Sequence, residues 1–242
     1  MKNKIILFTL FIFLIMTGLT FAVASDIVIT WKDASFSPHP TWWFVKDHYG
    51  FNTRSHNGSD GFWYTFSMDN TGQWCEWRKS ISGTKKYEVY VWIPKPDAFD
   101  PTPKSSYQDN YYPTNGARYR IYTSNGKKTI YQSHNVSRGD WVQLKETNGN
   151  SVFEFSSEVK VTLGDDTSEG ERGKRAIAFD AVKFVEVVYT WYKDNDDDGY
   201  SDYTTETQSD RPSSRYKLFS ELRSGTKDYC DNDPNKINPG NC

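Results

Sequence analysis

The sequence contains little cysteine and no excess of positive charge. Its 242 residues include three cysteines, and 29 basic side chains stand against 31 acidic ones. Because so few cysteines cannot form a dense disulfide framework, the fold must depend on other interactions. Proteins that follow nucleic-acid phosphates carry a clear basic excess, so we expect no nucleic-acid partner. A mean hydropathy of -0.75 likewise excludes a polytopic membrane protein.

Recognisable catalytic motifs are absent as well. The sequence contains no G-x-S-x-G nucleophile elbow, no H-E-x-x-H and no P-loop. Its four histidines fit no zinc-binding spacing, and the acidic residues between 165 and 171 are followed directly by basic ones. We therefore predict a protein without catalytic activity. A polysaccharide-active enzyme remains an alternative, which two carboxylates facing one cleft would support.

Aromatic and β-branched residues are abundant, and they occur in short runs. Aromatic residues make up 17% of the chain, including nine Trp and sixteen Tyr. We predict strands at Tyr87–Ile93, at Ala117–Tyr122 and at Thr129–Gln132, the last two joined by an Asn125-Gly126 turn. Further short strands are predicted at 141–144, 151–155, 159–163 and 176–188. This pattern favours an all-β fold, an antiparallel β-sandwich of jelly-roll type.

The N-terminal segment has the features of a secretory leader. Lys2 and Lys4 precede an uncharged run from 5 to 20, and Ala22-Val23-Ala24 then provides a small-x-small cleavage site. We predict cleavage after Ala24, a secreted or cell-surface protein, and no membrane contact once the leader is removed. The uncharged run is also near the length that spans a bilayer, so an uncleaved anchor remains the alternative.

Charge divides the remaining chain into two parts. Residues 190–242 contain eleven acidic and seven basic side chains, a net charge of -4, whereas residues 25–189 are neutral and rich in aromatic residues. We place a domain boundary near Tyr189. The acidic tail is too short and too polar to bury a core of its own, so we expect another interaction to order it.

The tail begins with a string of alternating carboxylates, D-N-D-D-D-G-Y-S-D at 194–202. Such carboxylates converge when the chain wraps around a cation, and Gly199 permits the sharp turn that this requires. Oxygen ligands of this kind suit Ca²⁺, although a solvated acidic turn remains the simpler alternative. The predicted ligands are the carboxylates of Asp194, Asp196, Asp198 and Asp202 and the carbonyl of Tyr200.

The three cysteines are expected to play two different roles. Cys230 and Cys242 lie near each other in the tail and could close a short disulfide loop in an oxidising compartment. Cys75 lies in an apolar run and is predicted to be a buried free thiol. The alternative is that all three thiols are reduced.

The body of the chain resembles the golvesin / xanthan-lyase C-terminal domain family. The resemblance rests on segments spread over most of the body, namely 61–64, 74–77, 87–94, 117–121, Gln132, 141–144 and 177–184. It implies a fold like that of carbohydrate-binding domains, in a family that accompanies hydrolases, lyases and surface proteins. The proline-rich excursion after Pro94 is longer than the family pattern.

The tail resembles the short metal-binding motif related to thrombospondin type 3 repeats. Trp191-Tyr192-Lys193-Asp194 opens it, and the acidic string from 228 to 240 closes it. The resemblance implies that the closing string also contributes ligands, which makes Asp228, Asp231 and Asp233 further candidates.

Together these features predict a non-catalytic module that binds carbohydrate through exposed rings, since sugar C–H faces stack on aromatic side chains. Our candidate platforms are Trp42 or Trp43 and the pair Tyr111 and Tyr112. A protein-interaction or structural surface module is the alternative. The tryptophans predicted to be buried are Trp77, Trp92 and Trp141.

Asp180 is a separate candidate, because it stands among apolar residues of the predicted last strand of the body. A buried carboxylate is paired, hydrogen-bonded or bound to a metal. Both a structural calcium ligand and a hydrogen-bonded core residue are consistent with this position.

Overall fold

The computed structural model describes residues 26–37, 43–45, 62–66, 73–94, 112–135, 139–169 and 175–235. Within these ranges the regular structure consists of β-strands and one turn of 3-10 helix, η3 (Phe219–Glu221). The predicted all-β class is confirmed. In this part of the chain, no helix is long and apolar enough to cross a membrane.

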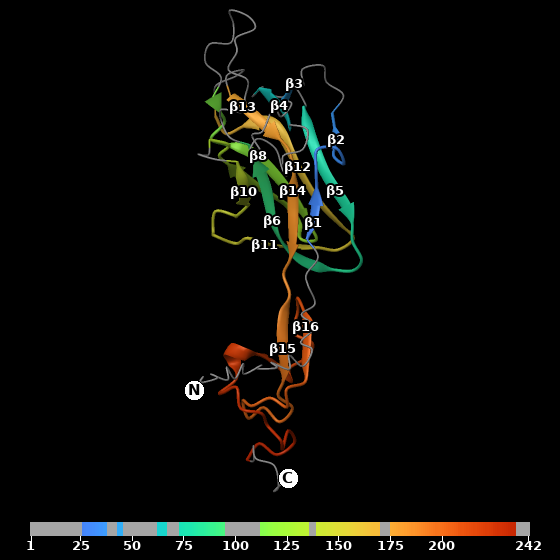
Figure 1. The fold of residues 1–242 in the computed structure, drawn as a ribbon, viewed down its shortest axis with the longest axis vertical. Helices are drawn as coiled ribbons and strands as arrows, with labels where there is room; N and C mark the ends of the chain where they lie inside the picture. Colours follow the sequence, from blue (N-terminus) through green and yellow to red (C-terminus); the bar gives the residue numbers. More distant parts are fainter. Residues whose placement is uncertain are drawn as a thin grey trace, which may run out of the picture.

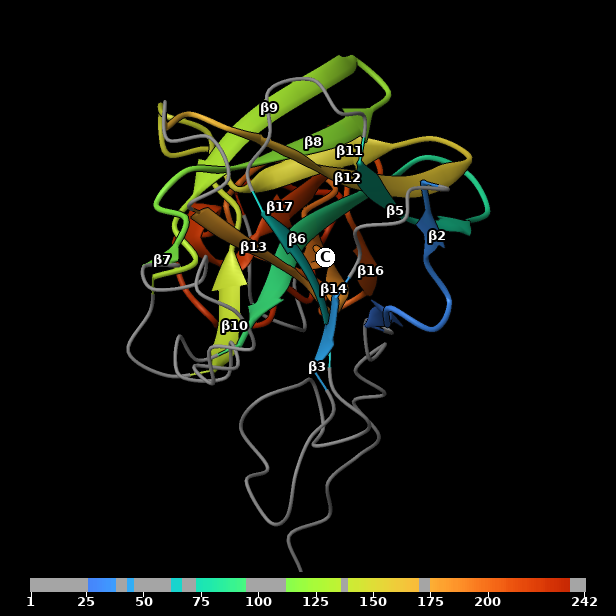
Figure 2. The same ribbon diagram turned by 90° about the horizontal axis from the view of Figure 1, so that it is seen from above.

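Two sheets of five strands form the body. The first sheet has the order β1-β14-β6-β10, with β11 also paired to β6, and every pairing in it is antiparallel. Its strands are β1 (Ile27–Ile29), β6 (Lys85–Ile93), β10 (Asp140–Gln143), β11 (Val152–Phe155) and β14 (Val182–Glu186). The chain passes repeatedly between this sheet and the second one, and the two form separate layers: Figure 2 shows β9, β8 and β12 of the second sheet above β10, β6 and β14 of the first.

The second sheet has the order β2-β5-β12-β8-β9 and is also antiparallel throughout. Its strands are β2 (Ser35–Phe36), β5 (Trp74–Ser80), β8 (Ala117–Thr123), β9 (Gly126–Gln132) and β12 (Glu158–Thr167). A register shift interrupts the pairing of β12 with β8 between Leu163 and Thr167. The two sheets confirm the antiparallel sandwich that the strand pattern predicts.

The core lies between the inner faces of these sheets. Along β6 the side chains of Tyr87, Val89, Val91 and Ile93 are buried, while the residues between them are half-exposed. This alternation follows from the two-residue period of a strand with one face covered. Cys75 on β5 is fully buried and is a free thiol, as predicted.

A third sheet, with the order β3-β4-β13-β7, closes the end of the sandwich that is remote from the C-terminal strands (Figure 1). Its strands are β3 (Trp43–Val45), β4 (Phe62–Phe66), β7 (Tyr112–Pro113) and β13 (Arg175–Phe179). β7 runs parallel to β13, and the other pairings are antiparallel.

The predicted strand at 176–188 is wrong in its continuity. It is divided at Asp180 and Ala181, because the chain leaves β13 in the third sheet and enters β14 in the first. Both residues of the break are held by the core: the Asp180 carbonyl accepts a hydrogen bond from Trp77 Nε1 (3.2 Å), and the Ala181 carbonyl accepts one from Trp92 N (2.9 Å). Asp180 is therefore buried between two strands rather than within one.

Two smaller predictions about the body are also corrected. Trp77 is buried, but Trp92 and Trp141 are half-exposed. They stand opposite each other on β6 and β10, with their rings edge to face at 5.6 Å, on the side of the sheet that faces away from the core. The turn between β8 and β9 is formed by Ser124 and Asn125, and the next residue, with φ 110°, already belongs to β9.

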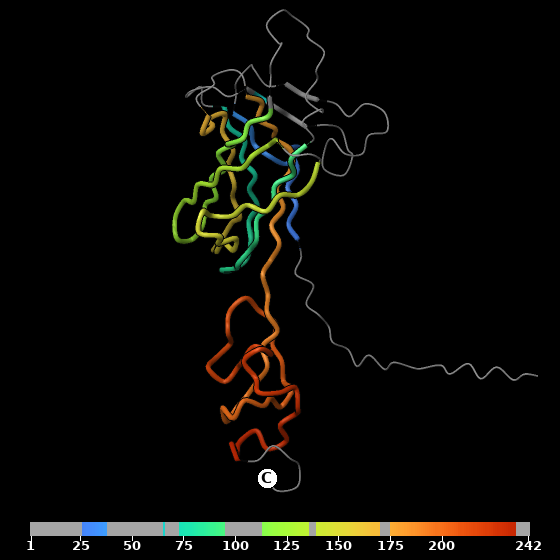
Figure 3. The backbone as a smooth tube through the Cα atoms, turned by 90° about the vertical axis from the view of Figure 1, so that its left-hand side faces the viewer, coloured from blue at the N-terminus to red at the C-terminus, as the bar shows by residue number. Residues whose placement is uncertain are grey.

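The C-terminal unit is a small sheet with the order β16-β15-β17. Its strands are β15 (Tyr189–Lys193), β16 (Thr205–Gln208) and β17 (Tyr216–Leu218). Figures 1 and 3 show this unit beyond the sandwich along the long axis of the molecule. Trp191 on its central strand is buried, and its indole N–H donates to the Gln208 carbonyl (3.0 Å).

Candidate functional site

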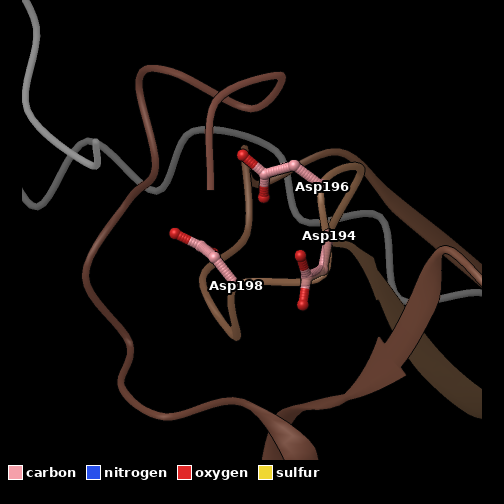
Figure 4. Close-up of side chains that lie close together, drawn as sticks. All are labelled: Asp194, Asp196 and Asp198. Atoms are coloured by element: carbon pink, nitrogen blue, oxygen red, sulfur yellow. The ribbon is translucent and has the colours of Figure 1, made fainter. Parts of the chain in front are cut away.

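Three carboxylates converge in the loop that follows β15. Asp194, Asp196 and Asp198 each have a carboxylate oxygen within 4.8 Å of the others. Figure 4 shows their side chains pointing toward a common space inside the loop. Asp194 and Asp198 are buried, and Asp196 is half-buried. The loop is tied to the sheet at its start, where the Asp194 backbone N–H donates to the Arg215 carbonyl (2.7 Å).

The backbone of the loop turns every second side chain inward. Asp197 has φ 64° and points outward, where it forms an ion pair with Lys217. Gly199 has φ 90°, and a Cβ there would lie 2.7 Å from Cγ of Arg223, so the position requires glycine. The Gly199 N–H donates to Asp194 Oδ2 (3.0 Å) and thereby holds the first carboxylate across the turn.

A fourth carboxylate reaches this cluster from the closing string. Ser201 and Lys227 form a parallel β-bridge, and the Asp228 N–H donates to the Ser201 carbonyl (2.9 Å). The Asp228 side chain is buried, and its Oδ1 accepts a hydrogen bond from the Cys230 N–H (2.7 Å). These contacts fix Asp228 beside residues that lie about thirty positions earlier in the chain.

Several oxygens of these carboxylates have no hydrogen-bond partner although they are removed from solvent. They are Asp194 Oδ1, both oxygens of Asp196, and Asp228 Oδ2. A buried carboxylate oxygen without a donor is costly, and most buried polar atoms in proteins are paired. The unpaired oxygens come from two separate segments, so the loop and the closing string together line one site with carboxylate oxygens, four of which have no donor.

The electrostatics of the site disfavour its negative charges. Burial raises the pKa of Asp196, and the nearby charges of Asp228 and Asp194 raise it further. Burial also raises the pKa of Asp198, with added repulsion from the other three carboxylates. Both raised pKa values mean that the ionised carboxylates are unfavourable here, and that a proton or a cation among them would lower their free energy.

The other predicted ligands lie beside this cluster rather than within its three-carboxylate group. Asp202 Oδ1 accepts from the Thr204 N–H (2.6 Å), and its Oδ2 lies 3.8 Å from Lys193 Nζ. Asp231 Oδ2 lies 3.7 Å from the same ammonium, and Asp231 Oδ1 accepts a hydrogen bond from the Asn195 N–H (2.9 Å).

Asp233 and Tyr200 complete the set of predicted ligands. Asp233 Oδ1 accepts from the Asn235 N–H (3.2 Å), which places it in the turn that follows Cys230. The Tyr200 N–H donates to Asp198 Oδ1 (2.8 Å), so this residue lies next to the cluster. Cys230 is buried and takes part in a disulfide. Cys242, its predicted partner, lies outside the described residues.

The remaining predicted sites belong to the body. Trp42 and Tyr111 lie outside the described residues, and Trp43 and Tyr112 are described only as members of β3 and β7. The buried Asp180 is not part of a cluster of potential metal ligands: among the described residues, only the group at 194–198 brings three such side chains together.

The structure also shows exposed rings that the sequence analysis missed. Trp74, Tyr122 and Tyr131 are 39%, 36% and 48% exposed and lie on the outer face of the second sheet. The signal was the alternation within their strands: Cys75 and Trp77 point into the core, and so Trp74 must point outward.

Comparisons with known proteins give structural likeness only. No family model matches the chain, and no curated protein matches it. One similar solved structure is the Podospora anserina GH26-CBM35 β-(1,4)-mannanase, with 10% identity and a TM-score of 0.39 over 68% of this chain. The chain spans only 28% of that enzyme. Another is the CBM35 from Cellvibrio japonicus Abf62, with 11% identity and a TM-score of 0.37 over 66% of this chain and 93% of the module. At these TM-scores the likeness places neither a ligand nor a site on this chain.

Proposed function

We propose that the C-terminal unit binds Ca²⁺ and is ordered by it. The ligands are the carboxylates of Asp194, Asp196, Asp198 and Asp228, together with the carbonyl of Tyr200. The observation that carries this proposal is the set of buried carboxylate oxygens that have no hydrogen-bond donor. A cation supplies the missing partner for each of them, and its positive charge offsets the burial and the mutual repulsion that raise the pKa of Asp196 and Asp198.

The chemistry of the ligands favours Ca²⁺ over other metals. All of them are hard oxygen donors, and the site includes no histidine or thiolate. Ca²⁺ accepts about 6–8 such oxygens in a flexible geometry, whereas Mg²⁺ demands a near-ideal octahedron. Asp231 supports the site from outside, because its hydrogen bond with the Asn195 N–H joins the closing string to the loop. Asp202 and Asp233 lie outside the cluster and accept hydrogen bonds within their own turns.

For the whole chain we propose a secreted or cell-surface binding module without catalytic activity, whose body binds carbohydrate. The support is a rigid sandwich with aromatic rings exposed on a strand face, which is the arrangement that stacks on sugar rings. We also propose a leader at 1–24 and two units that meet near Tyr189, where β15 begins the C-terminal unit.

A protein partner is the second candidate, and a separate observation favours it. Although the C-terminal unit is small, it exposes four large aromatic side chains, namely Tyr189, Tyr203, Phe219 and Tyr229. Aromatic residues are enriched in protein interfaces. A glycan array run with and without Ca²⁺ separates the two candidates, since a module that binds only protein gives no signal on it.

The calcium proposal is tested by calorimetry on the full mature chain. After removal of metal with a chelator, titration with Ca²⁺ is expected to show saturable heat. Asp196→Asn removes the charge of a carboxylate whose two oxygens are both buried without a partner. Changing a residue behind the ligands lowers metal affinity by ~10–100-fold, and the loss of this ligand charge should lower the Ca²⁺ affinity by more than that.

The matched control is Asp197→Asn, which neutralises the neighbouring carboxylate that points outward to Lys217. It should bind Ca²⁺ with nearly unchanged affinity. Absence of heat in the wild-type titration, or equal losses in the two variants, would contradict the proposal.

A further inference from the structure

The outer face of the second sheet carries two tyrosine rings that are held in place by cations. On β9, the Tyr131 hydroxyl accepts hydrogen bonds from Nε (3.0 Å) and Nη2 (2.7 Å) of Arg118, whose guanidinium lies 5.4 Å from the ring centroid. Lys160 Nζ on β12 lies 4.8 Å from the ring centroid of Tyr122 on β8. Rings fixed on strands in this way lose little conformational entropy when a ligand stacks on them.

A pad of two guanidinium groups and one carboxylate lies on the same face. Arg118 Nη1 and Arg120 Nη2 both donate to Asp166 Oδ2, at 2.6 and 2.5 Å. The pad packs closely on β12 at Gly164, which has no side chain. A Cβ at this position would come within 2.5 Å of Asp166 Oδ1 and 3.2 Å of Arg120 Nη1. A larger residue at Gly164 would therefore displace the side chains of Asp166 and Arg120.

The register of the strands places this pad between two exposed rings. Trp74 on β5 stands opposite Gly164 on β12, and Arg118 on β8 stands opposite Tyr131 on β9. Arg118 faces the part of β12 where the pairing shifts, which is also the part that contains Gly164 and Asp166. With neighbouring strands ~4.8 Å apart, the strands that carry Trp74 and Tyr131 are about 14 Å apart, and β12 and β8, which carry the pad, lie between them.

This face is positive, although the chain as a whole is negative. It carries five cations and three anions, and its charged residues are Arg78, Arg118, Arg120, Lys127, Lys160, Glu76, Glu158 and Asp166. Asp166 neutralises only one of the two guanidinium groups that it joins. Among the described residues, Nε and Nη1 of Arg120 have no hydrogen-bond acceptor, and the side chain is partly exposed (24%).

We propose that this face, defined by Trp74, Arg118, Arg120 and Tyr131, is a binding site for an acidic polysaccharide. The sugar rings stack on Trp74 and Tyr131, and their acidic groups accept hydrogen bonds from Arg120 and Arg118 between them. The net positive charge of the face selects the anionic polymer over a neutral one. The inference rests on the proposed carbohydrate-binding function and names both its site and its class of ligand.

The test is affinity electrophoresis of the full mature chain in native gels, in the presence of EDTA so that polymer-bound calcium plays no part. The gels contain polygalacturonate, alginate or carboxymethylcellulose as anionic polymers, and hydroxyethylcellulose or dextran as neutral ones. We expect at least one anionic polymer to retard the protein, and the retardation to weaken as salt is added. Trp74→Ala and Tyr131→Ala should each weaken the affinity by about tenfold, in line with the loss of a stacked ring.

The control variant is Tyr189→Ala, which removes a tyrosine of similar exposure (41%) from the C-terminal unit and should leave retardation unchanged. Since Trp74 and Tyr131 point to solvent, thermal unfolding should show that all three variants remain folded. Equal retardation of the wild type and the face variants would overturn this site but leave carbohydrate binding intact. Equal retardation by neutral and anionic polymers would overturn the ligand class, and no retardation by any polymer would overturn the proposed function as well.

Discussion

The body and the C-terminal unit bury different kinds of side chain. In the described part of the body most of the buried residues are apolar, among them Trp77, Phe155, Phe179 and Phe184. In residues 189–235, by contrast, only Trp191 and Cys230 are buried apolar side chains, and the buried carboxylates outnumber them: Asp194, Asp198 and Asp228.

This difference shows how each part can be stable. The body gains free energy by removing apolar surface from water, which requires no ligand. The C-terminal unit buries little apolar surface and concentrates like charges instead, which is why we propose that its stability depends on a bound cation. The disulfide at Cys230 adds a covalent constraint two residues after the buried Asp228, which is one of the proposed ligands.

The largest effect is expected from a change in the core of the body. Trp77 is 1% exposed, stacks on Phe179 and donates its indole N–H to the Asp180 carbonyl. Trp77→Ala should lower the free energy of unfolding of the body by about 3–5 kcal/mol, measured by urea denaturation. The neighbouring exposed residue provides the control, since Arg78→Ala should change it by less than about 0.5 kcal/mol.

The same experiment distinguishes the two regions. The loss caused by Trp77→Ala should be equal with Ca²⁺ and with EDTA, because the core binds no ion in this account. A loss that depends on Ca²⁺ would mean that the body and the C-terminal unit are stabilised together.

A smaller effect is expected from acid, through a buried histidine of the body. His134 accepts a hydrogen bond from the Ala178 N–H at Nδ1 (3.2 Å), and its Nε2 contacts the Tyr119 hydroxyl (2.9 Å). Full burial lowers the pKa of His134 to about 3. Below its ordinary pKa of about 6.5 the unfolded chain therefore binds a proton that the folded chain does not, and stability falls as the pH falls.

We expect the free energy of unfolding to drop by about 2–3 kcal/mol between pH 7 and pH ~4.5. His134→Gln should be less stable at pH 7, because it disturbs two buried hydrogen bonds, but its stability should depend less on pH over this range. An identical pH profile in the variant would show that other groups cause the acid sensitivity.

The sequence predicts the features that depend on local pattern. The alternation from Tyr87 to Ile93 identifies β6 and its inward side, and the spacing of Asp194, Asp196 and Asp198 predicts that these carboxylates meet. Both follow from geometry within a few residues, where a strand has a period of two and a tight loop turns alternate side chains inward.

Features that depend on contacts between distant segments were not predictable from the sequence. The break at Asp180 arises because β13 and β14 join different sheets, which local pattern does not show. Trp92 and Trp141 resemble core residues when each is considered alone. In the structure they stand opposite each other on the surface of the first sheet that faces away from the core. The approach of Asp228 to the loop likewise depends on a long-range contact, the bridge between Ser201 and Lys227, which no local pattern reveals.

The smallest effect is expected at the junction of the two regions. Only Val187 and Val188 separate β14 from β15, and the Val187 N–H donates to the Lys86 carbonyl (2.8 Å). Lys86 also forms an ion pair with Asp210 of the C-terminal unit, and the hydrogen bond between them raises the pKa of Lys86 and lowers that of Asp210.

Both side chains of this pair are partly exposed, so a double-mutant cycle with Lys86→Ala and Asp210→Ala should give a coupling of only ~0–1 kcal/mol that decreases with salt. A coupling of several kcal/mol would show that the two regions are energetically joined rather than separately stabilised.

Hydrogen exchange of the full mature chain, followed by mass spectrometry with Ca²⁺ and with EDTA, tests the central claim most directly. We expect amides in residues 189–235 to be protected with Ca²⁺ and to exchange at least ~100-fold faster in EDTA, while amides of β5, β6, β8 and β12 are unchanged. Equal protection of the C-terminal unit in the two conditions would contradict a calcium-ordered unit.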